Sequence, residues 1–173
     1  MTFEQAFDIV VKTEGGLSMN PGDPGNWTGG KVGIGQLKGT KWGISAAAYP
    51  DIDIAGLTPE GARDKYRPDY WDKVAGDHLP GPLALIMFDS AVNSGVGRAI
   101  KWLQAALGVP QKGGIGPVTL GALEAKRGQG ADLCAEVLAL RIVFDASLPT
   151  WPANALGWSR RLAKLPFQSM TGD

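Results

Sequence analysis

Cysteine and histidine are almost absent from this chain of 173 residues, which contains one of each, Cys134 and His78. A single cysteine excludes an intrachain disulfide and a cysteine-rich zinc site, and it is typical of folding in a reducing cytoplasm. His78 has no second histidine with which it could share a metal ion. We therefore expect neither a metal nor a cofactor.

Net charge is also lacking, because seventeen basic residues balance seventeen acidic ones. A nucleic-acid-binding protein usually carries a basic excess that pairs with phosphate, so we expect no nucleic-acid partner. No run approaches the roughly 18 apolar residues of a membrane helix. The first residues include Glu4 and Asp8, where an export signal would be basic. We expect synthesis in the cytoplasm and no stable insertion in a membrane.

Hydrophobic residues make up 44% of the chain, and most of them recur at helical spacing. The spacing predicts helices beginning near Thr2, Thr58, Pro82, Ala99, Pro117 and Leu133, with a possible seventh in the tail. Residues 17–43 are instead dense in Gly, Asn, Pro and Asp, which predicts turns and a short hairpin. The expected fold is mainly α, with at most a small β-hairpin or loop region after the first helix.

Glu14 stands where the apolar stripe of the first predicted helix, after Val10 and Val11, should continue. Burial and the C-terminal end of the helix dipole both predict a raised pKa for this carboxyl. A protonated carboxyl can donate the proton that a glycosidic oxygen needs when its C–O bond breaks. The alternative is an ion pair with Lys12 or Lys31 at a solvated helix end.

A glycosidase also needs a group that holds water or stabilises positive charge on the sugar ring, and Asp23 in the following loop is the nearest candidate. The alternative for Asp23 is an Asx-turn in its Pro- and Gly-rich surroundings. Thr28 and Thr40 could each position a water through the hydroxyl group, with Thr40 preferred. Either threonine could instead bond only to the backbone.

Glycan strands are bound by aromatic rings and by amide or hydroxyl groups. Trp27, Trp42 and Tyr49 are therefore candidate substrate-binding residues, with core packing as the alternative. Asp89 and Asn93 lie four residues apart on an otherwise apolar helix, so they share one face. They either line the substrate groove or anchor a neighbouring loop through hydrogen bonds.

Eight short blocks of the chain, each of which contains Gly or Asp, form one recognisable series. They are residues 14–18 (EGGLS), 20–25 (NPGDPG), 39–45 (GTKWGIS), 70–72 (YWD), 76–80 (GDHLP), 88–95 (FDSAVNSG), 103–108 (LQAALG) and 114–117 (GIGP). The series resembles glycoside hydrolase family 108, whose members are lysozyme-like N-acetylmuramidases, many of them phage or prophage endolysins. The last two blocks resemble the predicted peptidoglycan-binding part of that family.

The resemblance implies a lysozyme-like catalytic part over residues 1–83 and a helical peptidoglycan-binding part over residues 84–173, packed as one globule. It implies cleavage of the β-1,4 bond between N-acetylmuramic acid and N-acetylglucosamine, with Glu14 as the acid and Asp23 assisting. It also implies action on bacterial peptidoglycan after membrane permeabilisation, with a holin as partner. Three alternatives remain: a lytic transglycosylase, a non-catalytic peptidoglycan-binding lysis accessory, and a structural virion component.

Overall fold

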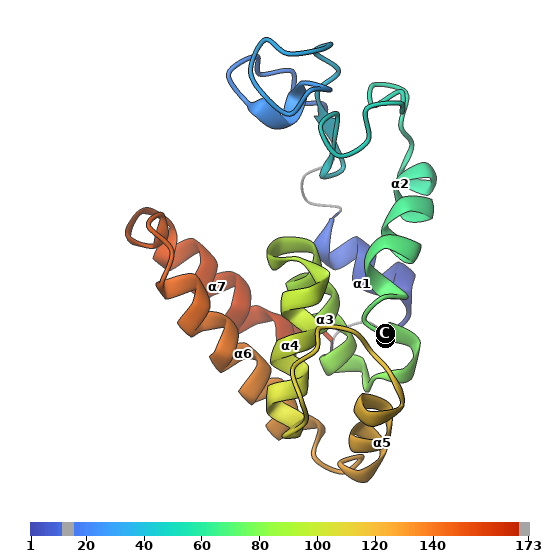
Figure 1. Cartoon of the computed structure of the whole chain (residues 1–173), viewed down its shortest axis with the longest axis vertical. Coiled ribbons are helices and arrows are strands. Elements are labelled where there is room, and N and C mark those ends of the chain that lie inside the picture. The colour runs from blue at the N-terminus through green and yellow to red at the C-terminus, as the bar shows by residue number, and fades with distance from the viewer. Residues whose placement is uncertain (12–15, 170–173) are drawn as a thin grey trace. The chain divides into compact units, whose positions relative to one another are not determined.

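The computed structural model describes residues 1–11 and 16–169, and this part of the chain is mainly helical (Figure 1). Its α-helices are α1 (Phe3–Val10), α2 (Pro59–Tyr66), α3 (Gly81–Ser94), α4 (Val96–Leu107), α5 (Pro117–Ala125), α6 (Gly130–Ala146) and α7 (Trp151–Gln168). Strands β1 (Thr40–Lys41) and β2 (Ile44–Ser45) form an antiparallel hairpin. The predicted mainly α fold with a small hairpin after the first helix is confirmed.

The chain forms two compact units. The smaller unit is Phe7–Tyr66, and the larger one combines Met1–Ala6 with Arg67–Asp173. These boundaries follow from contacts within the fold and do not test function. The division into a catalytic part over residues 1–83 and a peptidoglycan-binding part over residues 84–173 therefore stays a prediction. No helix within the described ranges is long and apolar enough to cross a membrane.

Helix α1 begins with a capping box. The Thr2 backbone N–H donates to Gln5 Oε1 at 2.8 Å, and the Gln5 backbone N–H donates to Thr2 Oγ1 at 3.3 Å. These reciprocal bonds satisfy two N–H groups that a helix start leaves unpaired. The predicted continuation of this helix to Glu14 lies outside the described residues.

Helix α3 is the core of the larger unit, where it packs against α4, α6 and α7 (Figure 1). Residues 83–91 are all buried, as expected for a helix that is apolar almost all round. Gly95 ends α3 with a φ of 89°, a backbone conformation that glycine tolerates best. Phe88 of α3 also meets Phe3 and Trp71, with ring centroids 5.9 and 5.7 Å away.

Helix α2 begins where the sequence predicts, because the Thr58 hydroxyl oxygen accepts the Gly61 backbone N–H at 3.1 Å. The predicted interruption at Pro68 takes the form of a change in helix type, with a π-helical segment over Arg67–Trp71. The Asp72 N–H accordingly donates to the Arg67 carbonyl, five residues earlier, at 2.9 Å.

Candidate active site

The hairpin of the smaller unit turns at Trp42 and Gly43, which both have left-handed backbones, with φ values of 53° and 72°. Two left-handed residues make a type I′ turn, whose twist matches that of a hairpin. Tyr66 Oη donates to the Trp42 carbonyl at 3.0 Å and helps to hold this turn. A side chain at position 43 would collide with the same Tyr66 hydroxyl, which explains why glycine stands there.

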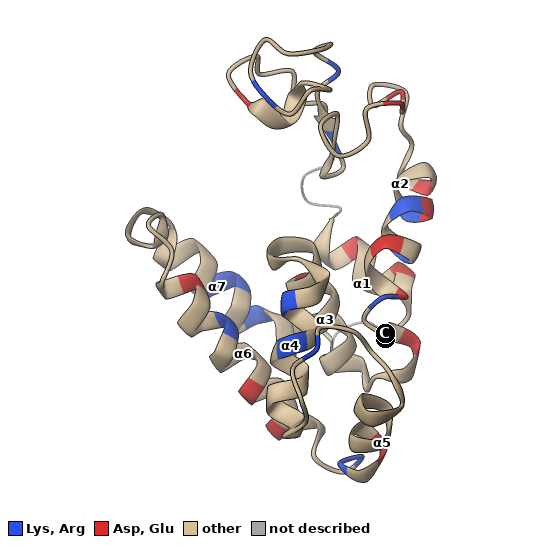
Figure 2. Cartoon of the chain, viewed as in Figure 1, with Lys and Arg blue, Asp and Glu red and all other residues tan. Residues whose placement is uncertain are grey.

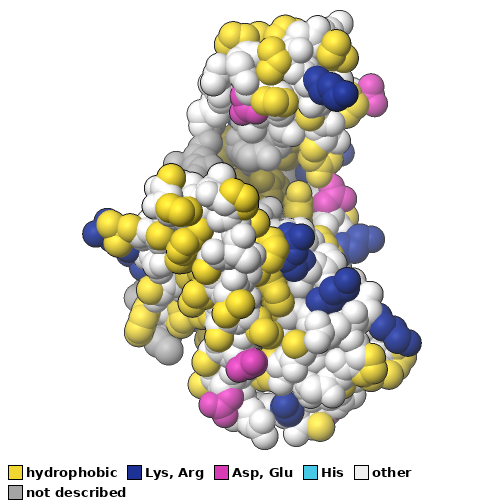
Figure 3. Space-filling model, turned by 60° about the vertical axis from the view of Figure 1, so that its left-hand side comes forward, with side chains coloured by type: hydrophobic (Ala, Val, Ile, Leu, Met, Phe, Trp, Pro, Cys, Tyr) yellow, Lys and Arg dark blue, Asp and Glu magenta, His cyan; other side chains and the backbone are white. Residues whose placement is uncertain are grey.

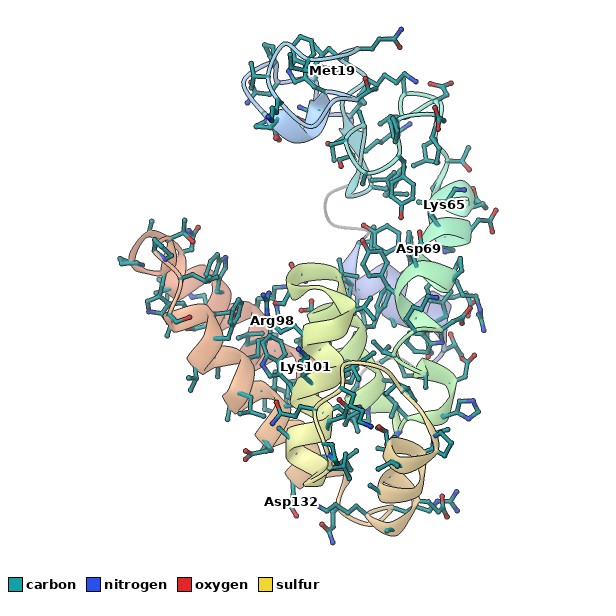
Figure 4. The ribbon with its side chains drawn as sticks, in the orientation of Figure 1. Met19, Lys65, Asp69, Arg98, Lys101 and Asp132 are labelled. Atoms are coloured by element: carbon teal, nitrogen blue, oxygen red, sulfur yellow. The ribbon has the colours of Figure 1, made fainter. Side chains whose placement is uncertain are left out.

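Gly39 brings the loop segments on either side of it close together. Its φ is 84°, and a Cβ built there would lie 2.5 Å from the Ser18 carbonyl oxygen and 2.6 Å from Met19 Sδ (Met19 is labelled in Figure 4). The neighbouring Thr40 pairs with Ser18 through two backbone hydrogen bonds of 2.8 and 2.9 Å. Thr40 is therefore fixed beside the segment that follows Glu14 in the sequence.

Asn26 is the polar centre of this loop, although the sequence analysis did not identify it. Its side chain is fully buried. Asn26 Nδ2 donates to the Asn20 carbonyl at 2.9 Å, and Asn26 Oδ1 accepts the Thr40 hydroxyl at 2.7 Å. The Asn26 carbonyl also accepts the backbone N–H groups of Lys38 and Gly39. One amide thus joins three stretches of a loop that has little apolar surface to bury.

The two candidate threonines have different partners. The Thr40 hydroxyl hydrogen is used by Asn26, so its oxygen can hold a water only by accepting a hydrogen bond. The Thr28 hydroxyl oxygen accepts the Gln36 backbone N–H at 2.9 Å. Thr28 therefore closes a different turn, beside the Trp27–Leu37 bridge. Neither arrangement excludes a catalytic role, and both assignments stay predictions.

Replacing Thr40 with valine tests its role, because valine keeps the shape and removes the hydroxyl. We expect Thr40→Val to lower the free energy of unfolding by about 1–3 kcal/mol, since Asn26 Oδ1 then lies buried without its donor. Denaturant unfolding gives this value. Thr28→Val is the matched control, and we expect it to cost less because Gln36 is exposed and water can replace the lost acceptor. Equal costs would contradict this account.

Asp23 adopts the predicted Asx-turn, because its Oδ1 accepts the Gly25 backbone N–H at 2.9 Å. It caps the short 3-10 turn Pro24–Asn26. The side chain is exposed, and its Oδ1 is the one carboxylate oxygen that is hydrogen-bonded to any of the described residues. The structural role is therefore present, and the second carboxylate oxygen remains able to act on a substrate or a water.

Asparagine at position 23 separates these two roles, because its amide oxygen can still accept the Gly25 N–H. We expect Asp23→Asn to keep the unfolding midpoint of the wild type and to lower the rate of glycan cleavage about tenfold to a hundredfold, through loss of the charge. Thermal unfolding and release of soluble muropeptides measure the two effects. Asp23→Ala, which also removes the turn, is the comparison. Full activity of the asparagine variant would limit Asp23 to the turn.

The three candidate aromatic residues are all half-buried in the smaller unit. Trp27 Nε1 donates to the Pro21 carbonyl at 2.9 Å, so its ring is fixed against the loop. Trp42 Nε1 is buried and has no hydrogen-bond partner among the described residues. An unpaired buried donor on a residue with a left-handed backbone is unusual, and such features concentrate at functional sites. Contact of Trp27, Trp42 and Tyr49 with substrate stays a prediction.

In the larger unit, Asp89 of α3 is an anchor between helices. It is 1% exposed. Its Oδ2 accepts Arg141 Nη1 of α6 at 2.6 Å, and its Oδ1 accepts Arg161 Nη2 and Nε of α7 at 2.6 and 2.9 Å. The exposed Asn93 donates to the Asp89 carbonyl and carboxylate at 2.8 and 3.2 Å. The anchor interpretation accounts for Asp89, with helices as partners in place of the expected loop. Substrate contact by Asp89 or Asn93 stays a prediction.

Asp145 of α6 lies at the edge of this cluster, 3.6 Å from Arg141 Nε. Burial raises the pKa of Asp145 above its ordinary value, the Arg141 charge opposes that rise, and the Asp89 charge adds to it. A carboxyl whose pKa is higher in the folded state stabilises the fold fully only below the unfolded pKa. This contribution is lost as the pH rises through the folded pKa.

We therefore expect Asp145→Asn to become more favourable, relative to wild type, as the pH rises from about 4 towards 7. Asparagine keeps the size of the side chain and cannot ionise. Urea unfolding of both proteins at the two ends of this range gives the difference in unfolding free energy. A difference that moves in the opposite direction would show that the pairing with Arg141 outweighs the burial of the charge.

Residues 7–95, just over half of the chain, match the family model described as glycosyl hydrolase 108. Ten solved chains match, among them one titled "Structure of Brucella abortus SagA". It is 32% identical with a TM-score of 0.78, and the match covers 97% of this chain and 93% of that one. No curated protein matched in the corresponding search.

Proposed function

The chain belongs to glycosyl hydrolase family 108 and is a glycosidase with a lysozyme-like fold, and we propose that it cleaves the β-1,4 bond between N-acetylmuramic acid and N-acetylglucosamine in peptidoglycan. The observation that carries this proposal is the family match over residues 7–95, which includes Glu14, Asp23 and Thr40. The family and the likeness to SagA support a peptidoglycan hydrolase in general, and the particular bond is our proposal.

In this proposal Glu14 donates its proton to the glycosidic oxygen as the bond to the anomeric carbon breaks. The departing N-acetylglucosamine leaves with a free hydroxyl group, and a water supplies the oxygen of the new reducing end. Asp23 stabilises the positive charge on the muramic ring or removes a proton from the water. Thr40 can hold this water through its hydroxyl oxygen, because its hydrogen is used by Asn26.

Binding of the glycan strand is assigned to the three aromatic residues of the smaller unit. Trp27, Trp42 and Tyr49 can stack on the apolar faces of the sugar rings. Trp42 also carries an indole N–H that has no partner among the described residues and could donate to an N-acetyl carbonyl. Glycan contact by the exposed amide of Asn93, which belongs to the larger unit, is a separate prediction.

Mass spectrometry of the fragments released from purified peptidoglycan tests the proposal. Reducing N-acetylmuramic acid ends would support it. Anhydro-muramic ends would replace it with a lytic transglycosylase, and reducing N-acetylglucosamine ends would move the cleavage to the other glycosidic bond. Binding to peptidoglycan without any release would show a non-catalytic wall-binding protein.

The proposal extends to where the enzyme acts. It is made in the cytoplasm of the host bacterium and reaches the cell wall after the membrane is permeabilised, with a holin as the expected partner. Expression of the chain in bacteria, with and without a co-expressed holin, tests this route. Lysis only in the presence of the holin supports it, and lysis by the chain alone overturns it.

A further inference from the structure

The connected ends of α6 and α7 project beyond α3 and α4 within the larger unit (Figure 1). Nearer the core, these helices bury Val137, Leu162 and Leu165, and both helices pack against α3. The apolar stripe of α7 continues towards the connection with Trp158 and Trp151, which are only half-buried. The apolar stripe of α7 therefore extends beyond the part of the helix that is buried against the core.

The outer faces of the same helices add further apolar side chains. Ile142, Val143 and Leu156 are 42%, 71% and 63% exposed. The rings of Trp151 and Trp158 lie 6.0 Å apart, two turns from each other on α7. We name these five residues the hairpin tip. Figure 3 shows hydrophobic side chains gathered on the face that includes it. Exposed apolar side chains that gather on one part of a protein mark a binding site more often than singly scattered ones do.

The charges around the hairpin tip are of one sign. Residues 138–169 contain a single acidic residue, Asp145, and it is only 6% exposed. Helix α7 carries three basic residues and no acidic one, and its basic segments are blue in Figure 2. Arg161 is held by Asp89, whereas Arg160 and Lys164 are exposed. The exposed acidic residues of α6, Asp132 and Glu136, lie in its first half, away from the connection with α7, and Asp132 is labelled in Figure 4.

We propose that the hairpin tip binds the surface of membranes that contain anionic lipid. Tryptophan rings favour the depth of the lipid headgroups, and aliphatic side chains such as Val143 and Leu156 favour the boundary of the acyl chains. Arg160 and Lys164 are placed to meet lipid phosphates. The hairpin lies in the interface and does not cross the membrane, in keeping with the lack of a spanning helix among the described residues.

Two other occupants fit the surface less well. A glycan strand could stack on Trp151 and Trp158, but it offers no apolar partner for Val143 and Leu156. A second copy of the chain could cover the apolar side chains, but a symmetric contact would bring the basic residues of both copies together. Anionic lipid matches both the apolar and the basic character of the tip.

Co-sedimentation with vesicles tests the proposal on the whole chain. We expect binding to vesicles of phosphatidylcholine mixed with phosphatidylglycerol, much weaker binding to phosphatidylcholine alone, and weakening by added salt because exposed charges are screened. The tryptophan emission should shift to shorter wavelength as the rings leave water. A wild-type protein that stays in the supernatant with both vesicles would overturn the proposal.

Two double variants test the hairpin tip in different ways. Val143→Asp with Leu156→Asp removes its apolar character, and Arg160→Glu with Lys164→Glu reverses its charge. We expect each to lower vesicle partitioning about tenfold or more while cleavage of purified peptidoglycan is retained. Val118→Asp, on the 65% exposed Val118 of α5, is the matched control and should bind like wild type. Circular dichroism confirms that each variant is folded.

Three further results would overturn the proposal. The first is vesicle binding that is unchanged in both double variants. The second is a wild-type dimer in sedimentation velocity that Val143→Asp with Leu156→Asp converts to a monomer, which would assign the tip to a second copy. The third is loss of peptidoglycan binding in the variants with no effect on vesicles. The glycosidase assignment survives all three, because purified peptidoglycan contains no membrane.

Discussion

Replacing Glu14 with glutamine is expected to lower the release of soluble muropeptides from purified peptidoglycan by about 10³-fold or more. Glutamine keeps the size and the hydrogen-bonding shape of the side chain but cannot give up a proton to the leaving oxygen. Because the leaving sugar is a poor leaving group without that proton, the chemical step should slow while binding to the wall is kept. Release over time and co-sedimentation with peptidoglycan measure the two quantities.

Glu136→Gln is the matched control for this experiment. Glu136 is exposed on α6 and lies outside the matched family region, so the same chemical change there should leave cleavage at the wild-type rate. If Glu14→Gln retained more than about a tenth of the wild-type rate, a loss too small for a general acid, another group would have to protonate the leaving oxygen. Loss of wall binding together with activity would instead indicate that Glu14 contributes to substrate binding.

The helical framework could be predicted because its signals are local. The capping box of Thr2 and Gln5, the continuous apolar pattern of α3 and the glycine that ends it at position 95 each depend on residues within a few positions of one another. Sequence alone therefore predicted the order of the helices and the central position of α3. The predicted acid, Glu14, lies outside the described residues, so its assignment depends on the sequence pattern and the family.

The organisation of the loop after the first helix could not be predicted in the same way. Asn26 is one polar residue among many in a stretch rich in Gly, Asn and Asp, and nothing nearby marks it as the buried one. The turn at Trp42 and Gly43 also lacks the usual Asn-Gly signal of a type I′ turn. It depends on Tyr66, which lies 24 residues after Trp42. Distant contacts decide both features.

The anchor at Asp89 shows the same limit in the larger unit. The sequence indicated that a carboxylate on an apolar helix needs a partner, but it did not identify that partner. Its partners Arg141 and Arg161 lie 52 and 72 residues further along the chain, on helices whose periodic pattern does not distinguish them from other surface arginines. The need for a partner was therefore predictable, and its identity depended on how the helices pack.

Truncating Asp89 to alanine is expected to lower the free energy of unfolding by about 3–5 kcal/mol, because the buried Arg141 cation loses its 2.6 Å partner and keeps only Asp145, at 3.6 Å, as a counter-charge. For a chain of this length we expect the melting temperature to fall by about 10 °C or more. Thermal unfolding followed by circular dichroism measures the change. The matched control is Asp132→Ala at the exposed start of α6, where we expect a loss of about 1 kcal/mol or less.

A compensated variant separates the loss of the pair from the loss of one partner. Replacing both Asp89 and Arg141 with methionine removes the buried ion pair. Asp145, whose pKa is already raised by burial, can then take up a proton, and Arg161 is 36% exposed and can turn to solvent. We expect the double variant to regain much of the lost stability, since buried ion pairs often gain little over apolar residues of similar size. Failure to regain any would show that the surrounding helices need the hydrogen bonds themselves.

The same variants distinguish the two interpretations of Asp89. An anchor acts only through folding, so cleavage by each folded molecule should stay close to the wild-type value at a temperature well below the transition. A residue that contacts the glycan strand would lose activity in the double variant even where the fold is fully recovered. Because Asp89 already holds two guanidinium groups and is 1% exposed, we expect the first result.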